Sequence, residues 1–277
     1  MHNIIVFGEA GAGKSSIVNM ILGQNVAKVS ASIESCTLRN DAFPVTIGNI
    51  TFNIYDTVGL NEGDQGRVPH WTALRELYTL IRQLEGVSLL IYCMRGRVKE
   101  NERANWLLFN KVICGEKIPI IAAVTGLETY DDPDDWWKDK TRRDLFRKNG
   151  ITPKAIGCVV SFPGRRNEYA HKYAKSQTRL QDLIVRNYLH RPWSEEKDKW
   201  FANMYAETFS TVLRFTTESR LDYTKKMRGM IQDFIKETGM KEEDSEKINA
   251  ALLNAEKELR KGPTVVASDS PYVFNST

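Results

Sequence analysis

Short apolar runs alternate with helical patterns along residues 1–190. Four runs bounded by turn-forming residues predict buried strands of a parallel sheet, at residues 4–7, 87–93, 118–124 and 155–160. Residues 43–47 and 51–55 flank a Gly48-Asn49 turn and predict an antiparallel hairpin. Apolar residues three and four apart predict helices at residues 71–84, 100–114, 135–148 and 173–188. This alternation predicts an α/β, three-layer domain with a mostly parallel six-stranded sheet over residues 1–190.

The pattern changes after Arg191-Pro192. Stripes of methionine, aromatic and aliphatic residues at helical spacing predict an α-helical extension at residues 191–262, and strand patterns are absent from it. Such stripes favour internal packing, with a partner surface or a peripheral membrane contact as the alternatives. Residues 263–277 lack periodicity and are predicted to be a disordered tail.

Composition narrows the function classes. A net charge of +4 gives no support for a nucleic-acid partner. The four cysteines show neither CxxC spacing nor nearby histidine pairs, so we expect no zinc site or disulfide framework, and a reducing, cytoplasmic location. The short apolar run before the first glycines does not predict a signal peptide, and no run reaches the ~18 residues of a membrane span.

The phosphate-binding motif GxxxxGK[ST] lies between the first predicted strand and a helical pattern. Glycines let the backbone wrap a phosphate chain so that consecutive N–H groups face its oxygens. The lysine of the motif neutralises the outer phosphates, and its serine hydroxyl can bind magnesium. The candidate nucleotide-binding residues are Gly8, Glu9, Ala10, Gly11, Ala12, Gly13, Lys14, Ser15 and Ser16. The strand–motif–helix context predicts a nucleoside triphosphate site.

A second motif, DxxG, directly follows the predicted strand at residues 51–55. Asp56 is placed to hold Mg²⁺ through water, and Gly59 would let a backbone N–H approach the terminal phosphate. Between the two motifs, Thr37 is the candidate to reach magnesium when the third phosphate is present, with Ser35 and Ser32 as alternatives. The candidate metal ligands are Ser15, Thr37 and Asp56.

The segment Thr125-Gly126-Leu127-Glu128 follows the predicted strand at residues 118–124 and bears on base recognition. Guanine selectivity commonly comes from [NT]KxD, whose carboxylate accepts hydrogen bonds from guanine N1 and N2. Adenine lacks that donor pair and would leave the carboxylate unpaired. Glu128 occupies the acidic position, Thr125 stands in for the asparagine, and Gly126 replaces the lysine that covers the base. The sequence therefore favours guanine, and the affinity stays open.

The stretches GEAGAGKSS, SCT, DTVGLNEG and VTGLE together resemble the immunity-associated (avirulence-induced type) GTPases, a septin-like and chloroplast-import branch of the P-loop GTPases. In that family the base-reading loop is of TRxE/D type, which fits TGLE. YCMRGRVKENE is similar in part to an extra box of the family, a GRxTxED-type segment. The resemblance implies that Ser161 begins the last base-contacting loop. It also implies a homodimer across the nucleotide face with an arginine supplied in trans. Arg97 is the candidate and Arg103 the alternative, unless both are surface residues or ion-pair partners.

We therefore expect a guanine-nucleotide-binding protein that hydrolyses GTP slowly with Mg²⁺ and is regulated by dimerisation or by a partner bound through the helical extension. Leu60 stands where many small GTPases carry the glutamine that orients the attacking water, and leucine cannot polarise water. The candidate catalytic residues are Lys14, Thr37, Gly59 and Arg97. The alternative is a scaffold that assembles with GTP or GDP bound and does not turn over. A third reading, an ATP-using kinase, would need an arginine-rich lid and a substrate pocket, neither of which we identify in the sequence.

Overall fold

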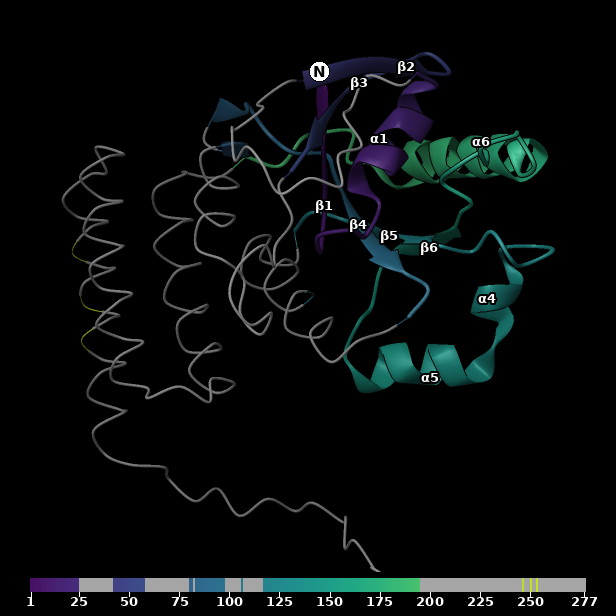
Figure 1. Cartoon of the computed structure of the whole chain (residues 1–277). Helices are drawn as coiled ribbons and strands as arrows, with labels where there is room; N and C mark the ends of the chain where they lie inside the picture. Colours follow the sequence, from purple (N-terminus) through teal and green to yellow (C-terminus); the bar gives the residue numbers. More distant parts are fainter. Residues whose placement is uncertain are drawn as a thin grey trace, which may run out of the picture. The chain divides into compact units, whose positions relative to one another are not determined.

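A six-stranded sheet forms the core of the described N-terminal part of the chain (Figure 1). The computed structural model describes residues 1–24, 42–57, 80–81, 83–97, 106, 117–194, 246, 250 and 253. The strands are β1 (His2–Gly8), β2 (Ala42–Ile47), β3 (Ile50–Asp56), β4 (Leu89–Arg95), β5 (Ile120–Thr125) and β6 (Ala155–Cys158). They lie in the order β2-β3-β1-β4-β5-β6, and only β2 runs antiparallel to its neighbour. The predicted α/β class and mostly parallel six-stranded sheet are confirmed.

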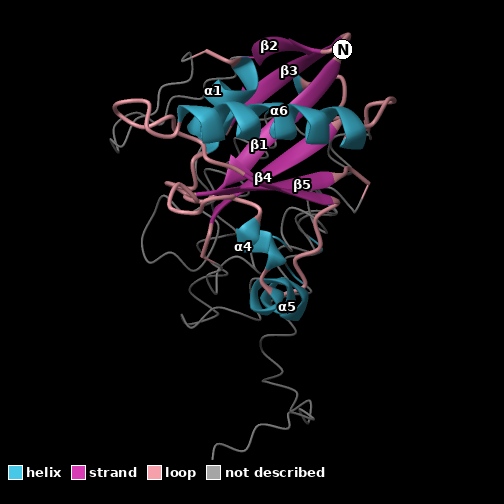
Figure 2. Ribbon diagram, turned by 90° about the vertical axis from the view of Figure 1, so that its right-hand side faces the viewer, coloured by secondary structure: helices cyan, strands magenta, loops and turns pink. Residues whose placement is uncertain are grey.

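The helices with described bounds are α1 (Lys14–Leu22), α4 (Asp135–Lys138), α5 (Lys140–Lys148) and α6 (Ala170–Asn187). Helices α1 and α6 lie side by side against one face of the sheet, and α4 and α5 lie together, apart from them (Figure 2). Gln177 Nε2 donates to Met20 O at 2.7 Å, and Gln181 Nε2 donates to Ile21 O at 3.0 Å. These bonds supply side-chain donors to carbonyls in the last turn of α1, where Met20 O also accepts a 3.3 Å hydrogen bond from Gly23 N. They fix the end of the helix whose first turn belongs to the motif at residues 8–15.

Both faces of the sheet are covered, which explains why its central strands are continuously apolar. Every residue of β5 is buried. On the face away from α1, Phe7 and Tyr92 have ring centroids 5.1 Å apart, and Tyr92 and Trp106 have theirs 5.8 Å apart. Burial on both faces leaves the carboxyl ends of the strands, with the loops that follow them, as the place for polar chemistry.

Two predicted elements differ in detail. The helix expected at residues 135–148 is divided at Asp139, which is extended at φ −64° and ψ 119°. Its Oδ1 accepts a 2.8 Å hydrogen bond from Thr141 N, so the side chain caps α5 instead of continuing α4. The strand expected at residues 87–93 spans Leu89–Arg95, and Val87 before it exchanges two 2.9 Å backbone hydrogen bonds with Trp193.

Other predicted elements lie outside the described ranges. Residues 80, 81, 83 and 106 are helical, and the rest of the helices predicted at 71–84 and 100–114 falls largely among residues that the structure does not describe. The chain divides into two compact units, Met1–Thr208 and Phe209–Thr277. In the second unit, residues 246, 250 and 253 are helical. The domain boundary at residue 190 and the disordered tail stay predictions. Among the helices described, none has the length and apolarity needed to cross a membrane.

Candidate functional site

The loop between β1 and α1 depends on three glycines with positive φ: 151° at Gly8, 72° at Gly11 and 92° at Gly13. A Cβ added at Gly8 would lie 2.2 Å from Cys93 O on the neighbouring strand, so only glycine fits there. Gly13 is the N-cap of α1 and has no side chain to accept a hydrogen bond from the first turn. The positive end of α1 therefore faces the loop with its N–H groups uncapped by a side chain, as an anion site requires.

Lys14 begins α1 and is folded back over this loop. Its side chain is buried, and Nζ donates to Glu9 O at 3.0 Å. Ala10 and Gly11 form the exposed part of the loop, and Ser16 is half-buried in the first turn of α1. The loop at residues 8–15 thus combines a lysine ammonium with a helix N-terminus, which is the arrangement predicted for the outer phosphates.

Ser15 and Asp56 form a polar pair beside the loop. The parallel pairing of β1 with β3 places Asp56 opposite Val6, near the start of the loop. Ser15 Oγ donates to Asp56 Oδ2 at 2.7 Å. Asp56 Oδ1 is buried and has no hydrogen-bond partner within the described parts of the chain. Burial raises the pKa of the Asp56 carboxyl, although the hydrogen bond from Ser15 and the charge of Lys14 oppose this change.

Thr125 joins the end of β5 to the loop at residues 8–15. It is 2% exposed, and its Oγ1 lies 2.8 Å from Ala12 O and 3.3 Å from Met94 O. A Cβ at Gly13 would lie 3.3 Å from Thr125 Cγ2, so the two segments are in close contact. The sequence singled out Thr125 for base recognition, and the structure shows that its hydroxyl donates to the backbone of the loop at residues 8–15.

Glu128 and Ser161 follow the carboxyl ends of neighbouring parallel strands. Glu128 is half-buried in the turn after β5, directly beyond the buried Leu127. Ser161 is half-buried after β6, and the preceding Val160 donates its N–H to Ser176 Oγ at 3.0 Å. Both side chains therefore lie on the edge of the sheet that carries the loop at residues 8–15.

One of the remaining candidates lies among the described residues. Arg97 is exposed just after β4. Thr37, Gly59 and Arg103 lie outside the described residues, as does Leu60. Sequence reasoning did not find Lys172 of α6, whose Nζ donates to Tyr130 O at 2.6 Å and approaches Glu128 O at 3.4 Å. No local pattern could reveal a contact across 42 residues of sequence.

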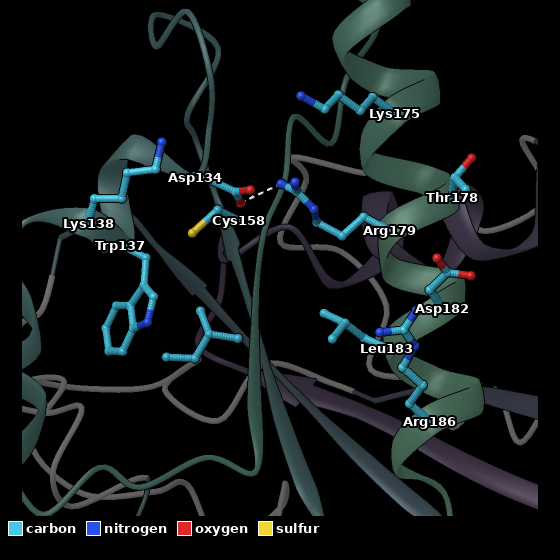
Figure 3. A pocket seen from close by; sticks show the side chains of 11 residues that line it. Asp134, Trp137, Lys138, Cys158, Lys175, Thr178, Arg179, Asp182, Leu183 and Arg186 are labelled. Atoms are coloured by element: carbon cyan, nitrogen blue, oxygen red, sulfur yellow. Dashed lines mark ion pairs between the residues drawn. The ribbon is translucent and has the colours of Figure 1, made fainter.

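A cavity of about 720 Å³ lies beside β6, between α4 and α6 (Figure 3). Its floor includes Ile156 and Cys158, and burial raises the pKa of the Cys158 thiol to about 12. Across it, Arg179 forms an ion pair with Asp134. None of its lining residues is one of the candidates above, so the cavity is separate from the predicted nucleotide site.

Comparison with known proteins points to one protein class. Residues 3–125 match the family model described as 50S ribosome-binding GTPase. Translocase of chloroplast 33 from Arabidopsis thaliana is 42% identical over 67 residues, which are 24% of this chain and 22% of that protein. The tRNA modification GTPase MnmE from Wigglesworthia glossinidia brevipalpis is 27% identical over 174 residues, which are 62% of this chain and 34% of MnmE.

Among solved structures, a dimerization-deficient mutant of Toc33 from Arabidopsis thaliana has a TM-score of 0.50 at 21% identity, covering 69% of this chain and 87% of that one. At this identity the likeness concerns the fold. The matched sequence ends at the carboxyl end of β5 and contains the loop at residues 8–15, the Ser15–Asp56 pair and Thr125. The fold is therefore that of the P-loop GTPases, and the part of the chain that matches the GTPase family model carries this site.

Proposed function

We propose that this protein binds GTP with Mg²⁺ and hydrolyses it slowly to GDP. The observation that carries the proposal is the group formed by Lys14, Ser15 and Asp56 at the N-terminus of α1. The buried ammonium and the N–H groups of the glycine loop stabilise negative charge on the phosphates, most of all as it develops on the β–γ bridge. The chain covers only 22% and 34% of the relatives named above, so this activity is argued from the site.

The residues present fit Mg²⁺. Hard cations prefer oxygen ligands, and Ser15 Oγ lies 2.7 Å from the carboxylate of Asp56. Asp56 Oδ1, buried and unpartnered in the described structure, is an oxygen that a cation or its water would satisfy. Ser15 and Asp56, with Thr37 from the sequence, would hold the ion. When bound, Mg²⁺ neutralises phosphate charge.

Guanine is the proposed base. Glu128 follows β5, and the segment that leads to it is fixed to the phosphate loop through Thr125. A carboxylate in this position accepts hydrogen bonds from guanine N1 and N2, and an adenine would leave it unpaired. Ser161, after the neighbouring strand, is proposed to line the same base site.

The proposals of slow hydrolysis and of its regulation are argued from the sequence. Leu60 cannot orient water, so an additional group is needed for fast turnover. We propose that a second copy of the chain supplies it through Arg97, which is exposed just after β4. An arginine supplied by a second copy would be in keeping with the immunity-associated and chloroplast-import branch of the P-loop GTPases, in which we propose to place this protein. A partner bound by the helical extension is a further route of regulation.

The location proposed is the cytoplasm. Cys93 and Cys158 are buried free thiols, which supports a reducing compartment. A GTP- or GDP-bound scaffold without turnover is the second candidate, and Leu60 is the observation that favours it.

Two experiments test these proposals. The first is displacement of a fluorescent guanine nucleotide by GTP, GDP and ATP in the presence of Mg²⁺, with wild type and Glu128→Ala. We expect displacement by GTP and GDP but not by ATP, with the preference lost in the variant. Equal displacement by ATP would reduce the assignment to a general P-loop nucleotide-binding protein.

The second experiment is single-turnover phosphate release measured against protein concentration. A rate that rises steeply with concentration supports hydrolysis activated by dimerisation. Absence of release at every concentration supports the scaffold. Arg97→Ala should keep nucleotide affinity and lose the dependence on concentration.

A further inference from the structure

Three cationic side chains on one face of α6 contact the segment that follows β5. Lys172, Lys175 and Arg179 are spaced three and four residues apart, which aligns them on one side of a helix. Arg179 forms an ion pair with Asp134 (Figure 3). Lys175 Nζ lies 3.8 Å from Asp132 Oδ2. The face is therefore held against the segment at residues 128–134, which begins with the proposed base-reading carboxylate.

Lys172 differs from the other two because it binds the backbone of this segment. Its Nζ donates to Tyr130 O at 2.6 Å and approaches Glu128 O at 3.4 Å. Hydrogen bonds from an ammonium group are roughly twice as strong as neutral ones. A cation that holds two carbonyls two residues apart fixes the path of the chain between them. Because the Glu128 carbonyl and side chain share one Cα, the contact also limits where the carboxylate can lie.

A second cation, Arg142, holds the Tyr130 side chain and the start of α4. Arg142 of α5 donates to Trp136 O and to Tyr130 Oη, both at 2.8 Å. Its guanidinium carbon lies 5.1 Å from the centroid of the Trp136 ring, within the range of a cation–π interaction. Loss of Lys172 would therefore loosen the turn around Glu128 and leave the attachment of α4 in place.

We infer that Lys172 is a positioning residue for base recognition: its ammonium sets the place of Glu128 through the Glu128 and Tyr130 carbonyls. The inference rests on the proposed guanine-nucleotide function. The contacts of Lys172 with the Glu128 and Tyr130 carbonyls lie outside the phosphate and metal site, so its contribution is to binding of the base. A positioning residue acts by pre-organisation: a carboxylate that is ordered only when the base binds spends part of its binding free energy on that ordering.

The test compares Lys172→Met and Lys172→Arg with a matched control on the same face, Lys175→Met, which loses only an exposed ion pair. The affinity of each full-length protein is measured for GDP and for inosine diphosphate, which lacks the N2 amino group, in Mg²⁺. We expect Lys172→Met to weaken GDP binding about tenfold and to weaken inosine diphosphate binding less, so that the GDP preference falls. Lys172→Arg should recover most of the preference, and Lys175→Met should keep it.

A double variant separates positioning from general damage. In the Glu128→Ala background, Lys172→Met should change GDP affinity less than about twofold, because the residue through which it acts is gone. An undiminished loss in that background, or an unchanged GDP preference in Lys172→Met, would overturn the inference and leave the proposed function standing. A wild type that does not prefer GDP to both inosine diphosphate and ADP would overturn both. Thermal unfolding of each apo-protein checks that the variants are folded.

Discussion

One buried hydroxyl, that of Thr125, joins the loop at residues 8–15 to the segment proposed to recognise the base, and Thr125→Val tests the importance of this hydroxyl. Valine keeps the shape of the side chain and removes the donor that lies 2.8 Å from Ala12 O. The site is 2% exposed, so water cannot replace the lost donor. A lost hydrogen bond with a buried acceptor left unpaired costs about 1–3 kcal/mol. We therefore expect Thr125→Val to lower the free energy of unfolding by about 2 kcal/mol.

The same change should weaken nucleotide binding, because Ala12 belongs to the loop that is proposed to hold the phosphates. If half of that free energy is used to restore the loop on binding, GDP affinity falls about fivefold. Urea unfolding of the apo-protein, followed by circular dichroism, measures the first effect, and competition with a fluorescent guanine nucleotide measures the second. Thr125→Ser is the control, since it keeps the hydroxyl and loses the methyl group. A valine variant with wild-type stability and affinity, or a serine variant as damaged as the valine one, would refute the role of the hydroxyl.

Three further predictions concern the phosphate loop and its neighbours. Lys14→Ala should weaken GDP binding at least ~100-fold in the same competition assay, and normal affinity would contradict its assignment. Gly8→Ala, whose Cβ would lie 2.2 Å from Cys93 O, should lose at least about 3 kcal/mol or fail to fold, whereas Gly11→Ala, with open space around its Cβ, should lose about 1 kcal/mol in urea unfolding. Equal losses of stability in the two variants would mean that the positive φ, and not the contact with Cys93 O, sets the cost of the added Cβ. Burial raises the pKa of Asp56 in the folded protein above its ordinary value of 3.8. The unfolded chain therefore loses this proton more readily, so the free energy of unfolding falls as the pH rises from 3.8 to the folded-state pKa, and this loss is absent at lower pH. Asp56→Asn should therefore gain stability over wild type between pH 3.8 and neutrality while losing Mg²⁺-dependent nucleotide binding, and a difference independent of pH would contradict the reasoning.

The parts of the fold that sequence predicts are those set by local pattern. Continuous apolar runs mark β1, β4 and β5 because these strands are covered on both faces, and the Gly48-Asn49 turn marks the β2–β3 hairpin. The phosphate loop is predictable because glycine, lysine and serine each have a separate physical reason to occupy it. The prediction of one continuous helix at residues 135–148 was wrong because a side-chain hydrogen bond interrupts it. At Asp139 the side chain bonds Thr141 N, and this ends a helical pattern that periodicity alone would continue.

Contacts between residues far apart in the chain could not be predicted from the sequence. Only glycine fits at position 8 because the Cys93 carbonyl of another strand lies so close. The last turn of α1 is held by Gln177, which is 157 residues from Met20. The role of Thr125 also becomes visible only when β5 is placed beside the phosphate loop. Spacing within a motif identifies the residue types that chemistry needs, but the groups that hold them in place come from whichever element packs there.

Asp56 shows how stability and the proposed chemistry differ in what they require. A buried carboxylate whose pKa is raised by burial is less stable in its charged form than in water, and Asp56 Oδ1 lacks a partner within the described structure. Ser15 and Lys14 offset only part of that cost. A residue chosen for stability alone would be neutral here, so the acidic side chain calls for a compensating positive charge at Oδ1. The N-terminus of α1 and Lys14 favour negative phosphates a few residues away, and a cation between the two would satisfy the carboxylate and the phosphates together. The buried Oδ1, unpartnered within the described structure, is therefore the strongest structural support for the proposal that this loop binds a nucleotide together with a metal ion.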